Sequence, residues 1–397
     1  MDSYPLYKYY FVGRDSYMAI LKLGFIGLGN FGGQVANALN KIDVKSMVFN
    51  ASEKDLDMLD KGVTPFCIGD GKGTGKSRDT AKMFLMENIS VLEDPAINEF
   101  INDCDAIFVG GSAGGGFGSG ATPKLVTILS TIYPNKCFDV ITTLPSINET
   151  YTAQNHAEQF IRELIDLNVG YLVYDNDQFT GMEASEMNQN IIQCIVDDMK
   201  ILRGDYILPT KTGGIDERDL LTVLSVPGRI VCSGLHNIRN VPNERIAEQL
   251  KKSIKGHAQL TDDKIINASA IMYNFLLPDL KAYAPTITSD IQELFGPHIS
   301  DYRNEVIDND SVASFIVCIL SGLSAPSERI DQIVNRRLKL ESELEDRHTA
   351  AMKLNSVQAG GLKLGVKSFG TAKPKDTQEI GDILKRFANA ENNKTIK

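Results

Sequence analysis

The sequence lacks the features that mark membrane proteins, disulfide-bonded proteins and zinc proteins. It has no apolar run near the roughly 18 residues of a membrane span, and its first residues hold no signal-peptide apolar core. The six cysteines lie far apart without a Cys-x-x-Cys pair, which is typical of reduced core residues in a cytoplasmic protein. The five histidines show no His-Glu-x-x-His spacing, so no protein-bound metal is predicted.

An excess of positive charge is also missing. The chain has 41 lysines and arginines against 51 acidic residues, a net charge of −10, which argues against nucleic-acid binding over its whole surface. A hydrophobic content of 43% and a charged content of 23% are ordinary for a soluble globular protein. The 397 residues suffice for two or three domains with real cores.

Glycine, by contrast, is concentrated between residues 106 and 123. Four apolar residues, 106–109, predict a buried strand, seven glycines follow within eleven residues, and a helix-like apolar pattern resumes at Thr122. A strand, a glycine loop and a helix make a phosphate cradle, because glycine lets several backbone N–H groups approach one anion. The alternative is a flexible linker, but a linker would not join a buried strand to an apolar helix.

This glycine loop resembles the GGGTG[TS]G signature of the tubulin and FtsZ family. One position departs from the signature, because Phe117 stands where the family usually has threonine. The change removes a hydroxyl group from the loop and leaves the backbone cradle intact. The resemblance implies that the following residues bind the phosphates of GTP: Gly114, Gly115, Gly116, Phe117, Gly118, Ser119 and Gly120.

An earlier glycine loop has two interpretations. Glycines at G-x-G-x-x-G spacing follow a predicted strand at 20–26, which fits a dinucleotide fingerprint. That fingerprint also needs a carboxylate at the end of the second strand, and the predicted strand 46–49 is followed by Asn50. The family resemblance instead implies two nucleotide loops. Their binding residues would be Gly29, Asn30, Gln34 and Asn50.

A third loop, at 68–77, contains Gly-Lys-Ser, which is also the end of a Walker A motif. The glycine that this motif needs at position 70 is Asp70, and no strand is predicted to end just before it in the required register. The resemblance implies a loop that senses the γ-phosphate through Gly71 and Lys72, with Lys76 nearby. A solvated basic turn is the alternative.

Later strands end in candidates for ribose and base contacts. The predicted strand 138–143 leads to Pro145 and Glu149, which resemble the family's ribose loop. The predicted strand 169–174 leads to Asn176, and a helix that buries a wide apolar stripe follows from about residue 187. The resemblance implies that Asn176 and Asn188 bind guanine, since an amide offers both a donor and an acceptor. The alternatives are a plain helix-start carboxylate for Glu149 and a plain N-cap for Asn188.

Asp216 and Asp219 have the three-residue spacing of a capping box at a helix start. They also match the family's N-x-D-x-x-D loop, in which Gly214 here replaces the asparagine. The resemblance implies that both aspartates are catalytic and orient water against the γ-phosphate held by the next subunit, with Mg²⁺ on the phosphates. The two roles are compatible, because a cap fixes the side chains that catalysis would use.

The C-terminal region reads as a long charged helix at 326–354 followed by a flexible tail. Residues 351–397 hold nine basic and four acidic residues, so a basic arm follows an acidic body. Such an arm suggests a protein partner, for example a DNA-binding adaptor. A solubilising tail without a partner is the alternative.

Together these patterns predict an α/β protein with a Rossmann-like parallel-sheet GTPase domain and a smaller mixed α+β activation domain. The ordered loops are similar to those of the TubZ-like plasmid and phage branch. They imply a GTPase that uses GTP, GDP and Mg²⁺, polymerises with itself and positions or segregates plasmid or phage DNA. A non-polymerising nucleotide-binding regulator and, on less support, a Rossmann oxidoreductase stay open. The predicted divisions are an N-terminal extension at 1–19, the GTP-binding domain at 20–186, a central helix at 187–205, the activation domain at 206–325, the helix at 326–354 and the tail at 355–397.

Overall fold

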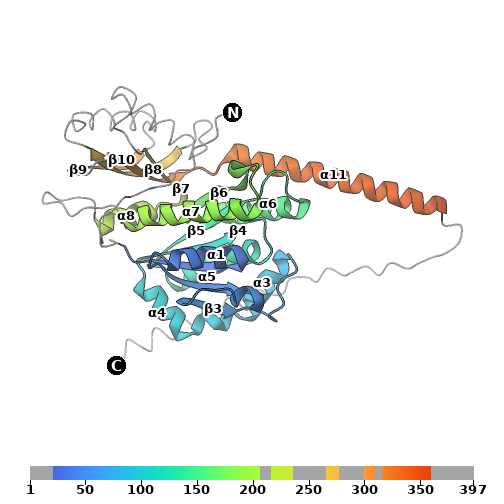
Figure 1. Ribbon diagram of the computed structural model, residues 1–397, viewed down its shortest axis with the longest axis horizontal. Helices are drawn as coiled ribbons and strands as arrows, with labels where there is room; N and C mark the ends of the chain where they lie inside the picture. The colour runs from blue at the N-terminus through green and yellow to red at the C-terminus, as the bar shows by residue number, and fades with distance from the viewer. Residues whose placement is uncertain (1–20, 206–215, 236–264, 277–298, 309–314, 359–397) are drawn as a thin grey trace, which may run out of the picture.

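The computed structural model describes residues 21–205, 216–235, 265–276, 299–308 and 315–358 (Figure 1). The predicted N-terminal extension, Gly214 and nearly all of the predicted tail therefore lie outside the described residues.

The described chain is built on one sheet whose first six strands are parallel and lie in the order β3-β2-β1-β4-β5-β6. The order reverses between β1 and β4, and ligands of such sheets bind at the carboxyl ends of the strands near this point. The predicted parallel α/β class is confirmed. The bounds are β1 (Leu23–Leu28), β2 (Lys45–Asn50), β3 (Val63–Cys67), β4 (Ala106–Ser112), β5 (Cys137–Leu144) and β6 (Gly170–Asp175).

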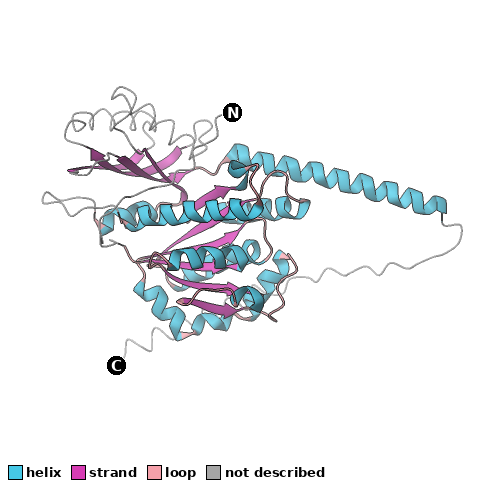
Figure 2. Ribbon diagram, in the orientation of Figure 1, coloured by secondary structure: helices cyan, strands magenta, loops and turns pink. Residues whose placement is uncertain are grey.

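Helices cover both faces of this sheet and enclose two apolar cores (Figure 2). One core lies against α1 and α7, and the other lies against α3, α4, α5 and α6. Each of the longer helices turns an apolar side to the sheet, as its spacing of apolar residues predicts. The bounds are α1 (Gly29–Asn40), α2 (Glu53–Leu56), α3 (Arg78–Glu87), η1 (Ile89–Glu93), α4 (Pro95–Asp103), α5 (Phe117–Ile132), α6 (Tyr151–Ile165), η2 (Asn176–Phe179) and α7 (Ala184–Arg203).

Three element positions differ from the sequence prediction. Helix α5 begins at Phe117 rather than near Thr122, because the last glycines of the loop are buried and form its first turn. Strand β3 does end just before the third loop. Its pattern is weak because it is the edge strand of the sheet, is partly exposed and contains Pro65. Helix α7 begins at Ala184, so Asn188 lies in its second turn and is not an N-cap.

The same sheet continues into the second half of the chain. Strand β7 (Gly228–Leu235) pairs parallel with β6, and the order then runs β10 (Phe315–Leu323), β8 (Ile265–Leu276) and β9 (Ile299–Asp308). Strand β10 is antiparallel to both β7 and β8, so this half of the sheet is mixed. Helix α8 (Glu217–Leu224) precedes β7 in the chain. The predicted domain boundaries stay a prediction, since one sheet runs through both halves.

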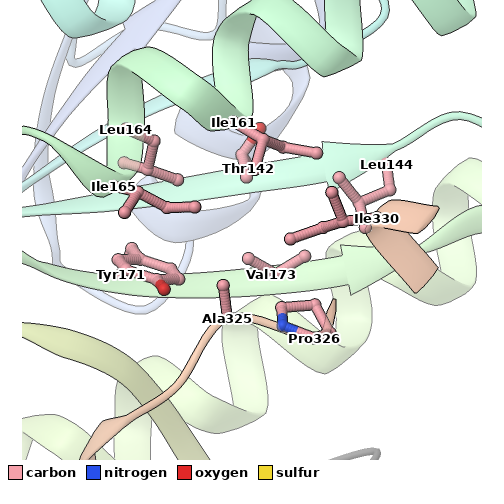
Figure 3. Close-up of a pocket in the computed structure, with 10 residues that line it drawn as sticks. All are labelled: Thr142, Leu144, Ile161, Leu164, Ile165, Tyr171, Val173, Ala325, Pro326 and Ile330. Atoms are coloured by element: carbon pink, nitrogen blue, oxygen red, sulfur yellow. The ribbon is translucent and has the colours of Figure 1, made fainter. Parts of the chain in front are cut away.

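The long helix α11 (Ser327–Gln358) leaves the body after docking against α6 and the sheet (Figure 1). Figure 3 shows Ala325, Pro326 and Ile330 lying beside Val173 and Leu144, around an apolar cavity of only about 10 Å³. Further along, Leu338 and Leu344 are about half exposed, so the apolar contact ends before the helix does. Within the described part, no helix combines the length and the apolarity of a membrane span.

A buried carboxyl group makes the stability of this fold depend on pH. Asp139 on β5 is 1% exposed, accepts a hydrogen bond from the backbone of Gly170 and lies beside Cys137. Burial raises the pKa of Asp139 to about 7. Between its ordinary pKa and pH 7 the folded chain therefore binds more protons than the unfolded chain. The free energy of unfolding then falls as pH rises through this window, at a limiting slope of about 1.4 kcal/mol per pH unit.

We expect Asp139→Asn to raise the free energy of unfolding at pH 7.5 by on the order of 2 kcal/mol and to have little effect at pH 4.5. The amide keeps an acceptor for Gly170 and carries no charge. Denaturant unfolding across this pH range measures the change, with Asp166→Asn at an exposed position as the control. If wild type and Asp139→Asn show the same pH dependence, the buried carboxyl group is not responsible for it.

Candidate nucleotide site

The first glycine loop and the signature loop touch at the carboxyl ends of β1 and β4. Gly29 adopts a φ of 71°, which favours glycine, and a Cβ atom there would lie 3.3 Å from the backbone nitrogen of Gly118. The signature loop also reaches the ribose loop, because the Ala113 N–H donates to the Thr143 carbonyl at 3.0 Å. On the same side, a Cβ atom on Gly114 would lie 3.3 Å from Pro145. Three of the predicted loops are therefore in contact.

The second and third loops pair with each other. The Glu53 N–H donates to the Gly71 carbonyl at 3.0 Å, and a short antiparallel bridge joins Ser52 to Lys72. The third loop in turn lies against the signature loop, since a Cβ atom on Gly116 would be 2.6 Å from the Cα of Lys76. Five predicted loops thus form one continuous edge, with the exposed Lys72 and Lys76 on its rim.

Asn50 makes hydrogen bonds within its own loop, and its predicted contact with the nucleotide stays a prediction. Its side chain is 4% exposed and accepts from the Ser52 N–H at 3.2 Å, while its amide donates to Asp55 at 3.1 Å. These bonds brace the second loop, which is a positioning role.

The signature loop leaves a group of backbone donors available. The Gly115 N–H donates to the Ser112 carbonyl and the Gly120 N–H to the Gly116 carbonyl. Across the described ranges, the N–H groups of residues 116–119, where α5 starts, have no backbone acceptor. Unsatisfied N–H groups at a helix start favour an anion.

The side chains of this loop turn away from that anion position. Phe117 is 6% exposed and belongs to the apolar core on this face of the sheet, so only its N–H group is offered to a ligand. The Ser119 hydroxyl donates back to the carbonyls of Gly115 and Gly116. The cradle is therefore made of backbone, and the loss of the family threonine at position 117 leaves it in place.

Two residues that the sequence analysis did not identify, His156 on α6 and Arg78 on α3, help to hold the signature loop in place. The His156 Nδ1 atom lies 2.9 Å from the Gly115 carbonyl, and burial lowers the pKa of His156, so the neutral ring donates from Nδ1. Arg78 is 3% exposed and donates to the His156 carbonyl at 2.7 Å and to Glu163 at 2.7 Å. Neither residue belongs to a recognisable motif, so no sequence signal pointed to them.

A cavity of about 630 Å³ opens beside these loops. This volume lies within the range of roughly 300–1,000 Å³ that is typical of small-molecule sites. The cavity is not lined by the predicted residues Gly29, Gly71, Lys72 and Pro145 or by the signature glycines, which adjoin it along the same edge. Five predicted residues do line it, namely Asn30, Gln34, Glu149, Asn176 and Asn188.

Polar groups in this cavity are partly pre-arranged. The Glu149 Oε1 atom accepts from the Ser146 N–H at 2.8 Å and from the Asn176 amide at 3.0 Å. Gln34 donates to Asn30 at 2.9 Å. The Asn176 Oδ1 atom is buried and has no donor within the part of the chain that the structure describes. A buried acceptor without a donor is costly, so a ligand N–H group at this position would be stabilising.

Asp216 and Asp219 form the predicted capping box of α8. The Asp216 side chain accepts from the N–H groups of Arg218 and Asp219 at 2.9 and 3.1 Å, and the Asp219 side chain accepts from the Asp216 N–H at 3.1 Å. Neither aspartate lines the cavity. Ser225, which ends α8, hydrogen-bonds Cys137 at the amino end of β5. The Ser225 end of α8 therefore lies by the amino end of β5, whereas the cavity lies beyond the carboxyl ends of the strands.

A family model described as "Tubulin/FtsZ family, GTPase domain" matches residues 22–184. This stretch covers the six parallel strands and every loop at the cavity edge. Residues 22–184 are a tubulin/FtsZ-family GTPase domain.

Two curated proteins illustrate the relatives of this tubulin/FtsZ-family domain. The tubulin-like protein TubZ of Clostridium botulinum C phage is 30% identical over 130 residues, which cover 32% of this chain and 36% of the relative. The tubulin-like protein CetZ4 of Haloferax volcanii is 27% identical over 175 residues, which cover 40% of this chain and 43% of the relative. The chain thus matches about two fifths of the length of these relatives. Both branches match to a similar degree, so a narrower placement with TubZ stays a prediction.

A solved structure extends the similarity of fold beyond the GTPase domain. CetZ2 from Haloferax volcanii, described as a GTPγS-bound protofilament, has a TM-score of 0.66 and 21% identity, and the match covers 82% of this chain and 100% of that chain. The fold of the tubulin/FtsZ-family domain and of the mixed sheet beyond it is therefore shared.

Proposed function

We propose that this protein acts in the cytoplasm, where it binds GTP at the carboxyl ends of its parallel strands, hydrolyses it and polymerises head to tail. The observation that carries the proposal is the convergence of six loops on one edge. They offer free backbone N–H groups at 116–119 for phosphate and the unpaired Asn176 oxygen for a base N–H group. Guanine carries N–H donors next to each other on its pairing edge, which suits an acceptor at this place.

The ribose and the metal ion fit the same arrangement. Glu149 keeps its second carboxylate oxygen for sugar hydroxyls. No group of three metal-ligating side chains lies together in the residues that the structure describes. A Mg²⁺ ion would therefore be held mainly by the phosphates and by water, as is usual for this ion. When bound, it neutralises charge on the phosphates.

We infer that hydrolysis needs two subunits. Asp216 and Asp219 start α8, whose other end contacts the amino end of β5, and neither aspartate lines the cavity of its own subunit, so the nucleotide on which they act would belong to another copy. In such an assembly, the surface at the amino ends of the strands in one subunit would contact the surface at the carboxyl ends in the next. A contact between two different surfaces is heterologous, and it generates a filament when it does not close into a ring. The CetZ2 relative, described as a protofilament with GTPγS, supports this arrangement. A carboxylate of the incoming subunit would orient the attacking water.

The cellular role is a finer part of the proposal. Movement of plasmid or phage DNA, with an adaptor on the basic tail, rests on the resemblance to the TubZ branch and on the charge of residues 351–397. The oxidoreductase alternative is disfavoured because β2 ends in Asn50, whose side chain braces its own loop. The non-polymerising regulator stays as the second candidate, since Phe117 and Gly214 depart from the family pattern.

The deciding experiment measures the GTP hydrolysis rate per subunit against protein concentration, with sedimentation in parallel. We expect the rate per subunit to rise sharply above a threshold concentration at which the protein also pellets, because each site is completed by a neighbour. ATP in place of GTP is the control for base selection. A rate per subunit that is the same at all concentrations, with no pellet, would favour the regulator and leave the two aspartates as a helix cap only.

A further inference from the structure

One arginine of α11 contacts both loops at the nucleoside end of the cavity. Arg329 is 6% exposed and lies in the first turn of the helix. Its Nε atom donates to Asp175 at 2.7 Å. Its Nη2 atom donates to the Pro145 carbonyl at 2.6 Å and pairs with Asp177 at 2.8 Å. A single guanidinium group therefore joins the loop after β5 to the loop after β6.

The acceptors of Arg329 are close to the residues expected to meet the ribose and the base. Asp175 and Asp177 flank Asn176 in the chain. The other oxygen of Asp177 accepts from the Ser146 hydroxyl at 2.6 Å and from the Ile147 N–H at 3.0 Å. Asn176 itself donates to Glu149 across the gap between the loops. The separation of the two loops is thus set by bonds that run through Asp177 to Arg329.

We propose that Arg329 is a positioning residue for the nucleoside end of the nucleotide site, so that nucleotide binding and the docking of α11 are coupled. The inference rests on the proposed function. Arginine suits the role because its planar group donates in several fixed directions at once, which lysine does not. A buried guanidinium also needs its carboxylates, so the loops and the helix hold one another in place. Thermodynamic reciprocity then requires bound nucleotide to strengthen the docking of α11.

A second pair on α11 supplies a matched control. Arg337 donates to Glu158 of α6 at 2.8 Å and pairs with Glu341 on its own helix. These contacts hold α11 to the body and involve neither the 145–149 loop nor the 175–177 loop. Arg337→Gln therefore removes one contact between α11 and the body, while the Arg329 contacts that dock the start of the helix on the two loops stay in place.

The experiment titrates GDP and GTP calorimetrically into full-length wild type, Arg329→Gln, Arg329→Lys and Arg337→Gln. We expect Arg329→Gln to weaken the binding of GDP and of GTP by the same factor, roughly 10- to 100-fold, because the two nucleotides share the same nucleoside. Arg329→Lys should recover part of the loss, and Arg337→Gln should stay within about 3-fold of wild type. Hydrogen exchange should show faster exchange at 145–149 and 175–177 in Arg329→Gln without nucleotide, and slower exchange at the start of α11 in wild type with GDP.

Three outcomes overturn the inference. Equal losses in Arg329→Gln and Arg337→Gln would assign the effect to helix docking in general. Wild-type affinity in Arg329→Gln would show that the contact sets nothing at the site. If Arg329→Gln does not fold, wild-type affinity in folded Arg329→Lys would have the same meaning. A wild-type protein that binds neither nucleotide contradicts the proposed function itself, whereas the first three outcomes leave the proposed function standing.

Discussion

Gly116→Ala is expected to weaken GTP binding by at least about 100-fold, equivalent to about 2.8 kcal/mol. The added Cβ atom would lie 2.6 Å from the Cα atom and 2.8 Å from the carbonyl carbon of Lys76, and both of these are backbone atoms that cannot move aside as a flexible side-chain end could. Lys76 already adopts a φ of 62°, a left-handed conformation with little freedom for a non-glycine residue. The clash is relieved by moving the third loop away, which opens the phosphate end of the site.

The matched control for this variant is Gly33→Ala on α1. Its added Cβ atom meets the end of the Leu59 side chain at 3.3 Å, a neighbour that can move slightly. We expect the affinity of Gly33→Ala for GTP to lie within about 3-fold of the wild-type affinity. Its free energy of unfolding should lie within about 1 kcal/mol of the wild-type value. Calorimetric titration with GTP, alongside thermal unfolding, separates lost binding from lost folding. Folded Gly116→Ala with wild-type affinity would show that the third loop does not border the phosphates.

Much of the GTPase domain was predictable because its signals are local. The strands β1, β4 and β6 contain short apolar runs, and a glycine loop between a buried strand and a helix is typical of a phosphate site. The capping box of α8 was predictable for the same reason, since an aspartate at the N-cap and another three residues later satisfy N–H groups within one turn. The order of these loops along the chain carried the family resemblance, which the family model confirms over residues 22–184.

The features that sequence reasoning missed depend on contacts between distant residues. Arg329 meets Pro145 across 184 positions, and nothing near residue 329 marks this arginine among the charged residues of α11. His156 was passed over in the same way, because its partner is a backbone carbonyl in another element. Asn50 resembled a nucleotide ligand by its place in the chain, and only the structure shows its bonds turned into its own loop. Strand β3 was missed because an edge strand needs apolar residues on fewer sides.

The second large effect is expected from a substitution in the loop that holds Asp216 and Asp219, here called the acidic loop. We expect Asp219→Asn to bind GTP like wild type, to hydrolyse it at least 100-fold more slowly and to leave filaments that persist, since loss of a single catalytic group has effects of this order. Asparagine keeps an oxygen acceptor for the Asp216 N–H, so the cap of α8 is retained. Asp219→Ala also removes the hydrogen bond from the Asp216 N–H to the side chain at position 219, at a cost of about 0.5–1.5 kcal/mol in stability, and leaves the Asp216 side-chain cap in place. Comparing the two variants separates the structural role from the catalytic role.

Mixing two inactive variants tests whether the site is shared between subunits. Asp219→Asn keeps its nucleotide site and loses the acidic loop, whereas Gly116→Ala loses its nucleotide site and keeps the loop. In a head-to-tail filament, the intact nucleotide site of an Asp219→Asn subunit can meet the intact acidic loop of a Gly116→Ala subunit. Such a contact holds all the residues that hydrolysis needs. Random mixing in equal amounts makes roughly a quarter of the contacts complete.

GTP turnover of the mixture at fixed total protein should therefore reach about a quarter of the wild-type rate, whereas each variant alone should stay near zero. Wild type mixed with Gly33→Ala serves as the control for dilution and for mixing itself. Recovery of GTP turnover in the mixture is the decisive result. Neither variant holds both an intact nucleotide site and an intact loop, so turnover can come only from a contact between two subunits. A mixture as inactive as its components, in pellets that contain both variants, would show that the aspartates act on their own subunit or serve only as the cap of α8.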